Sequence, residues 1–460
     1  MSEAKKTIER VRGTRDILPG EYARRRHAWE KIREVFERFG YRGVELPTIE
    51  PVELHLMKSG EDIVKHLYSF EDQSGEKICL RPEFTASVVR MFISELQNEP
   101  LPIRLFYLGS TFRYDRPQMG RYREFTQAGV ELIGGSTPEY DAEVLAITCR
   151  VMDALEFQNY ELVIGNIGIT LKFLSQKRLE EDVKKYLLEN LESLNKAGDK
   201  DGYIAKIKEG LKERGLPCGK ATDEALEFIR KLIAIKGLPP GVFDEVDVLL
   251  KAYNVSDAPL NELRAIADYL NYYEVDWTKA RIDFGFGRGL MYYTGMIFEI
   301  YCYTDRLGES QKQVCGGGRY DTLIGALGCS RDVPSAGFSF GLDRLLLAMG
   351  EVSEAPAFLD AFVAPIGGEA EFQHAIYVAN RLREKGLRAE IGPKGGSPRE
   401  LTGMANRLGA RFVLYIGEAE LAEKVVALRD MKMKEQKKCP LEEAIGIINS
   451  KRYRTTDEHG

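Results

Sequence analysis

The residues best suited to chemistry lie in one stretch, residues 111–134, which reads TFRYDRPQMGRYREFTQAGVELIG. It predicts a strand, a polar loop turned by Pro117 and Gly120, and a second strand. Since strand side chains alternate, one face of the second strand carries Arg123, Phe125, Gln127, Gly129 and Glu131. Arg113 ends the first strand on the same face as Leu105, Tyr107 and Gly109. An amphipathic hairpin with one solvated face is the simpler interpretation, but this mixture of groups favours a platform for a ligand.

Two further stretches carry groups of the same kind. In LRPEFTA, Glu83 and Thr85 share parity, and a carboxylate and a hydroxyl suit an α-ammonium group; the alternative is a helix start with Thr85 as its N-cap. In RGLMYYTG, Tyr292 and Tyr293 either line a pocket or are ordinary strand aromatics. The neighbouring GFGRG is a weak nucleotide fingerprint because it lacks the full GxGxxG pattern.

Composition excludes several other classes of protein. Hydrophobic residues make up 44% and charged residues 30%, which is typical of a soluble globular protein, and no apolar run reaches the roughly 18 residues of a membrane helix. Seven single cysteines without CxxC support neither a disulfide framework nor a zinc site, and five histidines show no HExxH, so no metal-ligating residues are predicted. There is no GxxxxGK[ST] P-loop, and the net charge of −6 speaks against non-specific coating of nucleic acid. The N-terminus lacks a signal peptide, so a cytoplasmic location is expected.

The stretch at 111–134 resembles motif 2 of the class II aminoacyl-tRNA synthetases in its histidyl form. LRPEFTA, RGLMYYTG and VCGGGRYDTLIGALG (314–328) resemble further segments of the histidyl family, and SAGFSFGLDRLLLAM (335–349) resembles motif 3. A predicted helix over residues 21–39, with apolar positions at Ala28, Ile32, Val35 and Phe36, and a short strand closed by Pro47 resemble motif 1, which forms the dimer interface in that family.

The resemblance implies a role for each matching residue. Arg113 and Arg288 would act on the α-phosphate of ATP as the catalytic residues, and Phe125 and Arg344 would stack on the two faces of adenine, with Asp115 and Arg121 as further ATP contacts. The implied histidine site comprises Glu83, Thr85, Arg113, Gln127, Glu131, Arg288, Tyr292, Tyr293 and Tyr320. Glu83, Thr85 and Gln127 would hold the amino group, while Glu131 and Tyr293 would read the imidazole nitrogens. The chain departs from the family at Phe84, usually glycine, and at Met291, usually aspartate.

The chain predicts an α/β protein with four segments. Residues 1–169 and 280–350 would form the two parts of an antiparallel-sheet class II catalytic core, and the strongly helical residues 170–279 an insertion between them. Strands alternating with helices over residues 358–460 predict a largely parallel α/β domain that resembles the anticodon-binding domain of several class II synthetases. Its basic residues, Lys394, Arg399, Arg407 and Arg411, suit RNA phosphates and an ordinary surface equally.

The resemblance implies a homodimeric enzyme that activates histidine with ATP and Mg²⁺ and transfers it to histidine tRNA. Two alternatives remain at this point. The synthetase-like regulatory subunit of ATP phosphoribosyltransferase shares the core and senses histidine without charging tRNA, and Phe84 and Met291 slightly favour it. An RNA-binding protein with an inactive core would have lost the phosphate-binding arginines, which are present.

Overall fold

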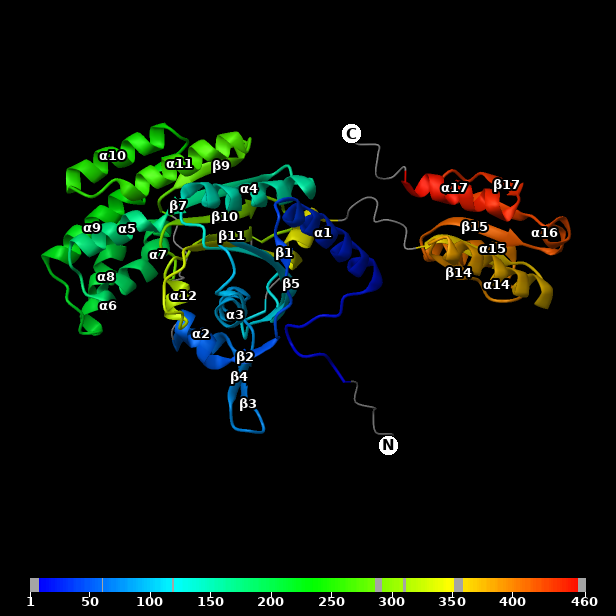
Figure 1. Ribbon diagram of the computed structural model, residues 1–460, viewed down its shortest axis with the longest axis horizontal. Coiled ribbons are helices and arrows are strands. Elements are labelled where there is room, and N and C mark those ends of the chain that lie inside the picture. The colour runs from blue at the N-terminus through cyan, green and yellow to red at the C-terminus, as the bar shows by residue number, and fades with distance from the viewer. Residues whose placement is uncertain are drawn as a thin grey trace. The chain divides into compact units, whose positions relative to one another are not determined.

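The computed structural model describes residues 8–59, 61–117, 120–285, 292–308, 312–350 and 359–453 (Figure 1). These residues form two compact units, one up to residue 350 and the other from residue 359. Each unit has a sheet and a hydrophobic core of its own.

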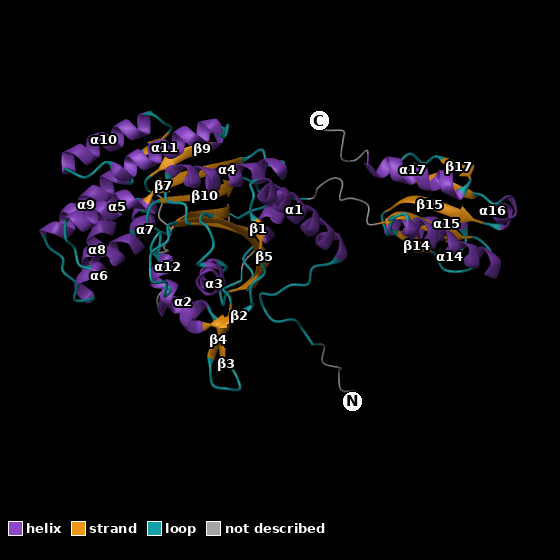
Figure 2. Ribbon diagram, in the orientation of Figure 1, coloured by secondary structure: helices purple, strands orange, loops and turns teal. Residues whose placement is uncertain are grey.

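A nine-stranded sheet organises the first unit (Figure 2). In order across the sheet its strands are β1 (Arg42–Gly43), β5 (Ile103–Phe112), β6 (Glu124–Ile133), β12 (Ser335–Gly341), β11 (Gln313–Arg319), β10 (Met296–Cys302), β7 (Tyr160–Asn166), β9 (Ala280–Asp283) and β8 (Lys236–Gly237). The strands from β5 to β7 are mutually antiparallel, so the prediction of an antiparallel core is confirmed. The predicted hairpin at 111–134 is the pair β5–β6, with Thr111 opposite Phe125.

Three helices cover one face of this sheet: α1 (Pro19–Arg38), α4 (Pro138–Ala154) and α13 (Leu342–Met349). The four predicted apolar positions of α1 are all buried, and Phe36 lies 5.8 Å from Phe106 of β5 between ring centroids. The side chains of Ala128, Val130 and Leu132 in β6 complete this core. Helix α1 therefore forms because its apolar stripe covers the even-numbered face of β6.

The opposite face of the sheet carries a smaller layer. It contains α2 (Val52–Ser59), η1 (Glu61–His66), α3 (Thr85–Met91), η2 (Phe92–Leu96), α12 (Leu323–Ala326) and a three-stranded sheet of β2 (Ile49–Pro51), β4 (Lys77–Leu80) and β3 (Tyr68–Glu71). A turn at Ser74 and Gly75 joins β3 to β4, and α3 begins at Thr85. This layer brings Glu83 and Thr85 against the odd-numbered face of β6.

Residues 167–279 are almost entirely helical, and Figure 1 shows them in green as a block at one end of the sheet. The helices are α5 (Ile167–Gln176), α6 (Glu181–Glu189), α7 (Leu191–Lys196), α8 (Lys200–Glu213), α9 (Lys220–Leu232), α10 (Gly241–Tyr253), α11 (Ala258–Tyr272) and η3 (Trp277–Lys279). Strand β7 ends at Asn166, and α5 begins directly after it at Ile167. The buried residues of this block belong to the same continuous core as those of α1 and α4.

The second unit is a five-stranded mixed sheet flanked by helices. Its elements are β13 (Leu359–Pro365), α14 (Glu369–Glu384), β14 (Ala389–Ile391), α15 (Pro398–Arg407), β15 (Ala410–Ile416), α16 (Glu418–Glu423), β16 (Val426–Asp430), β17 (Gln436–Cys439) and α17 (Leu441–Tyr453). The three predicted strands, β13, β14 and β15, are parallel as expected. The largely parallel sheet is corrected to a mixed one, because β16 and β17 add two antiparallel pairings that the sequence analysis did not find.

Candidate functional site

The sheet face that carries Glu131 is lined with small residues in the central strands. Gly129, Gly318 and Gly337 lie on β6, β11 and β12, and each leaves the space that a neighbouring side chain occupies. A Cβ added at Gly337 would stand 1.8 Å from a carboxylate oxygen of Glu131, one at Gly318 would stand 2.9 Å from the ring of Tyr293, and one at Gly129 would stand 2.6 Å from the hydroxyl oxygen of Tyr107. The glycines therefore create the room in which polar and aromatic side chains pack on the sheet.

Glu131 lies at the centre of these packed side chains and is only 1% exposed. Its Oε1 accepts a hydrogen bond from the Tyr107 hydroxyl at 3.3 Å, and its Oε2 accepts one from the Tyr320 hydroxyl. Burial raises the pKa of Glu131 to about 7, although the hydroxyls of Tyr320 and Thr85 lower it by hydrogen bonding to the carboxylate. A buried carboxylate poised near neutral pH suits an imidazole, whose ordinary pKa is also close to 7.

Glu83 and Thr85 lie beside this carboxylate, at the start of α3. The backbone N–H groups of Thr85 and Ala86 donate to the two carboxylate oxygens of Glu83 at 2.8 and 3.1 Å. The alternative in which Thr85 is the N-cap was wrong, since Glu83 satisfies the free N–H groups of the helix instead. The buried ammonium of Lys58 also donates to Glu83 at 2.7 Å. Burial raises the pKa of Glu83, but Lys58 and His55 outweigh it and hold the pKa below the ordinary value.

Phe84 stands where the family usually has glycine, and it points into the core. It is 1% exposed, and its ring stacks on Tyr107 at 4.3 Å with an angle of 9° between the rings. The guanidinium of Arg81 covers the ring of Phe84 at 4.1 Å. Phe84 thus supports the tyrosine that hydrogen bonds to Glu131, and it does not narrow the pocket from the solvent side.

The two tyrosines of RGLMYYTG reach the same pocket. Their rings lie 4.5 Å apart, and Tyr292 also faces Tyr320 at 6.0 Å. The ammonium of Lys58 lies 4.5 Å from the centre of the Tyr292 ring, which is cation–π geometry. Arg288 and Met291 belong to residues 286–291, which lie outside the described residues.

Arg113 and Phe125 form the other end of the same face. The guanidinium carbon of Arg113 lies 5.3 Å from the centre of the Phe125 ring, and its Nε donates to the backbone oxygen of Pro82 at 3.0 Å. Gln127 lies between Phe125 and Glu131 on β6, and its Nε2 donates to Ser339 Oγ at 3.1 Å. Among the residues that the structure describes, Gln127 Oε1 is buried and no donor bonds it, so it is an acceptor that a ligand could use.

The loop between β5 and β6 is held by ion pairs and by the helix that follows β12. Arg121 donates to Asp115 Oδ2 at 2.7 Å, and His66 Nδ1 lies 2.7 Å from Asp115 Oδ1. Burial raises the pKa of Asp115, but Arg121 and His66 hold it below the ordinary value. Arg344 of α13 donates to the backbone oxygens of Gly120 and Gln313 at 3.2 and 2.9 Å.

The structure therefore brings most of the predicted residues into two adjoining groups. One group surrounds Glu131 and consists of Glu83, Thr85, Tyr292, Tyr293 and Tyr320. The other contains Arg113 with Phe125, and Asp115 with Arg121, while Arg344 meets the loop through main-chain oxygens.

The sequence analysis missed Lys58, His55 and Tyr107 as members of the site. Tyr107 was found on the correct strand face, but its contact with Glu131 depends on the register of β5 against β6. Lys58 and His55 lie three residues apart in an ordinary amphipathic helix, and that spacing on one face was the only available signal.

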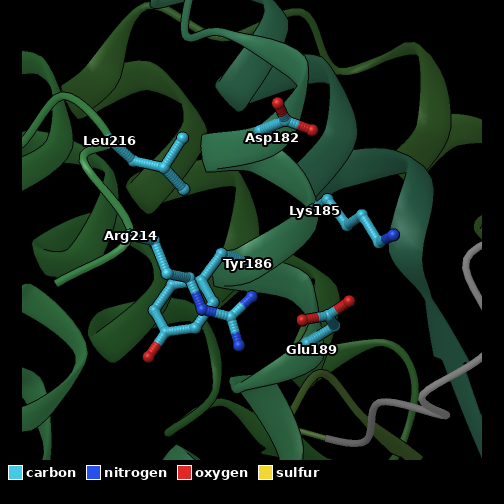
Figure 3. Close-up of a pocket in the computed structure, with 6 residues that line it drawn as sticks. All are labelled: Asp182, Lys185, Tyr186, Glu189, Arg214 and Leu216. Atoms are coloured by element: carbon cyan, nitrogen blue, oxygen red, sulfur yellow. The ribbon is translucent and has the colours of Figure 1, made fainter. Parts of the chain in front are cut away.

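A separate cavity of about 270 Å³ lies in the helical block (Figure 3). Figure 3 shows Asp182, Lys185 and Glu189 of α6 at its wall, and the guanidinium of Arg214 covers the ring of Tyr186 at 4.5 Å. None of the predicted site residues lines it.

Across the described ranges, no group of three or more His, Cys, Asp and Glu side chains is arranged to hold a metal ion. In the same residues, no helix is both long enough and apolar enough to cross a bilayer.

Comparison with known proteins assigns the family. The model of the histidyl-tRNA synthetase family matches residues 13–345, and the model of an anticodon binding domain matches residues 360–451. The histidine–tRNA ligases of Thermococcus kodakarensis and Pyrococcus furiosus are each 38% identical to this chain, over 96% of it and over 98% and 99% of their own lengths. The solved histidyl-tRNA synthetase from Nostoc sp. PCC 7120 has the same fold, with a TM-score of 0.78 at 22% identity over 97% of this chain and 100% of that one. The chain belongs to the histidyl-tRNA synthetase family.

Proposed function

We propose that this protein is a histidine–tRNA ligase, which activates histidine with ATP and transfers it to the 3′ end of histidine tRNA. The observation that carries the proposal is the buried cluster of polar and aromatic side chains around Glu131, which adjoins Arg113 and Phe125 on one sheet face of a chain that matches the family in both units.

The pocket is suited to read an imidazole by polar contacts. Tyr107 and Tyr320 fix the carboxylate of Glu131 from two sides, so it is oriented before a ligand arrives. Glu131 would accept from one imidazole N–H, and Tyr293 would bond the other nitrogen. An apolar side chain of similar size would leave these buried groups without partners, and sites of this kind reject such analogues strongly.

The amino group of histidine would bind between Thr85, Gln127 and Glu83. Gln127 Oε1 has no partner within the described part of the chain, whereas Glu83 already accepts from Lys58 and from two backbone N–H groups. The substrate ammonium therefore competes with Lys58 for Glu83.

The activation step joins the histidine carboxylate to the α-phosphorus of ATP. A carboxylate oxygen forms the new bond, the bond from the α-phosphorus to the bridging oxygen breaks, and pyrophosphate leaves with that electron pair. Two anions must approach one another, so Arg113 and Arg288 would offset the repulsion and stabilise charge on the phosphoryl oxygens. Phe125 would stack on adenine, with Arg344 on the other face.

The metal in this reaction would be Mg²⁺ that enters with the phosphates of ATP. Mg²⁺ keeps several waters and is commonly bound by substrate phosphates and one or two carboxylates, so it needs no protein cage. The bound ion would neutralise charge on the β- and γ-phosphates.

The second unit supports the transfer step. Residues 360–451 match an anticodon binding domain, which is expected in a protein that selects a tRNA. A subunit that only senses histidine does not need such a domain. The full-length similarity to histidine–tRNA ligases likewise favours tRNA charging over the regulatory alternative. We further propose a cytoplasmic homodimer that associates through the elements that resemble motif 1.

Exchange of labelled pyrophosphate into ATP tests the activation step. We expect exchange that depends on histidine, and a fall of about 10²- to 10³-fold in kcat for Arg113→Met, because one preorganised donor to the phosphoryl oxygens is lost. Arg288→Ala should behave in the same way. Arg230→Met is the matched control, since Arg230 is 39% exposed and pairs with Glu227 of its own helix at 2.8 Å. Histidine binding without exchange would refute the ligase and favour a histidine sensor.

A further inference from the structure

The N-terminal segment of residues 11–16 packs against the loop that would hold ATP. The backbone N–H of Arg123 donates to the carbonyl oxygen of Gly13 at 2.8 Å, and the carbonyl of Arg123 accepts from the N–H of Arg113 at 2.8 Å. Gly13 has φ +89°, and a Cβ there would stand 2.8 Å from Cγ of Arg123 and 2.9 Å from Cγ of Pro117. Only glycine fits between this turn and the loop.

Arg15, two residues further on, connects three separate parts of the first unit. Its Nη1 donates to Glu21 of α1 at 2.5 Å, and its Nη2 donates to Asp343 of α13 at 2.6 Å. Its guanidinium carbon also lies 4.6 Å from the centre of the Tyr122 ring in the loop. The side chain is only 21% exposed, so these charge-assisted bonds are partly shielded from water.

Asp343 is the residue on which these contacts converge. Its Oδ2 accepts from the backbone N–H of Thr126 at 2.8 Å, and its Oδ1 accepts from Arg15 and, at 2.7 Å, from Arg25 of α1. Burial raises the pKa of Asp343, but Arg25 and the other donors hold it below the ordinary value, so the side chain is a carboxylate at neutral pH. Thr126 follows Phe125 in β6, and Asp343 precedes Arg344 in α13. The hydrogen bond between Thr126 and Asp343 therefore joins the two segments that carry Phe125 and Arg344.

From these contacts we propose that Arg15 is a positioning residue for ATP, which fixes Asp343 and so sets the spacing between Phe125 and Arg344. This inference rests on the proposed function, because it assumes that adenine binds between those two side chains. Arg15 itself touches neither the base nor the phosphates, and it acts through Asp343 and Tyr122. The N-terminal segment would then help to shape the nucleotide site as well as connect to α1.

The test compares KM for ATP with KM for histidine in pyrophosphate exchange by the full-length protein. Arg15→Met should raise KM for ATP about tenfold, the effect expected when one shielded, charge-assisted contact is lost, and should change KM for histidine less than about twofold. Arg15→Lys keeps the positive charge but lacks the planar guanidinium with its several N–H donors. Its KM for ATP should therefore lie between those of wild type and Arg15→Met. Arg10→Met is the matched control from just before this segment, because Arg10 is 62% exposed and its guanidinium lies 3.6 Å from the carboxylate of Asp16. Gly13→Ala is a second variant, which should raise KM for ATP by displacing Arg123.

The outcomes separate this inference from the proposed function. If the unmodified protein shows no histidine-dependent exchange, the proposed function fails and the inference fails with it. If exchange occurs and Arg15→Met leaves KM for ATP within about twofold of the control, the inference alone is refuted. Equal rises in both KM values, together with a lower melting temperature, would also refute it, because they would indicate a general structural role.

Discussion

Replacing Glu131 by glutamine should stabilise the empty protein at alkaline pH and remove histidine activation. Burial raises the pKa of Glu131 from its ordinary value of 4.5 to about 7 in the folded state. The folded state therefore binds this proton more tightly than the unfolded state does. Protonation of Glu131 therefore stabilises the folded state. This stabilisation has its full size below pH 4.5 and is lost as the pH rises through 7.

The size of the effect follows from the pKa change. A rise from 4.5 to about 7 corresponds to about 3 kcal/mol, which wild type has lost by pH 8 and still largely retains at pH 5. Glutamine has the same shape and does not titrate, and its side-chain oxygen still accepts from the Tyr320 hydroxyl. Relative to wild type, Glu131→Gln should gain about 2 to 3 kcal/mol between pH 5 and pH 8.

Denaturant unfolding of the ligand-free proteins at several pH values between 5 and 8 measures this difference. Glu299→Gln is the matched control, because Glu299 is 8% exposed on the same sheet and already accepts from Gln313 and Tyr301. A Glu131→Gln difference that stays constant over this range, or that favours wild type more as the pH rises, would refute the reasoning. Saturating histidine should stabilise wild type and leave the variant unchanged.

Three further changes test two other contacts of the site and one buried ion pair between β11 and α4, that of Arg319 with Asp141. Phe125→Leu should raise KM for ATP about tenfold with KM for histidine unchanged in pyrophosphate exchange, because base stacking on an aromatic ring is worth about 1 to 3 kcal/mol; an equal rise for both substrates would contradict this. Lys58→Met should lower the free energy of unfolding by about 3 kcal/mol at pH 8, because it leaves the carboxylate of Glu83 buried without its ion pair. The loss should be smaller at pH 5, where Glu83 can take up a proton. A loss that is the same at both pH values would argue against this ion pair. Arg319→Met should lower the melting temperature by several degrees by leaving Asp141 buried and unpaired, and an unchanged melting temperature would argue against that pair.

Local patterns predicted the elements whose apolar face is regular. Helix α1 follows the 3.6-residue spacing of Ala28, Ile32, Val35 and Phe36, all of which are buried. The alternation in β6 placed Gln127 and Glu131 on one face, as the register with β5 shows. In contrast, β17 reads QKKC, and its exposed lysines give no apolar alternation, so that edge strand was missed.

Contacts between distant segments could not be predicted from local patterns. Arg15 and Asp343 are 328 residues apart, and nothing in the N-terminal segment shows that it will meet α13. Glu83 was expected to face the pocket, but its use as the cap of α3 and as the partner of Lys58 depends on how α2 packs. Charged groups that combine only in three dimensions are therefore the part of the site that sequence reasoning leaves out.

Charging of histidine tRNA with labelled histidine is the measurement that tests the central claim most directly. The full-length protein with ATP and Mg²⁺ should esterify the 3′ end of histidine tRNA, and Arg113→Met should slow this about 10²- to 10³-fold. Neither alanine nor phenylalanine should replace histidine. Histidine binding or pyrophosphate exchange without any charging of the tRNA would contradict the assignment as a ligase.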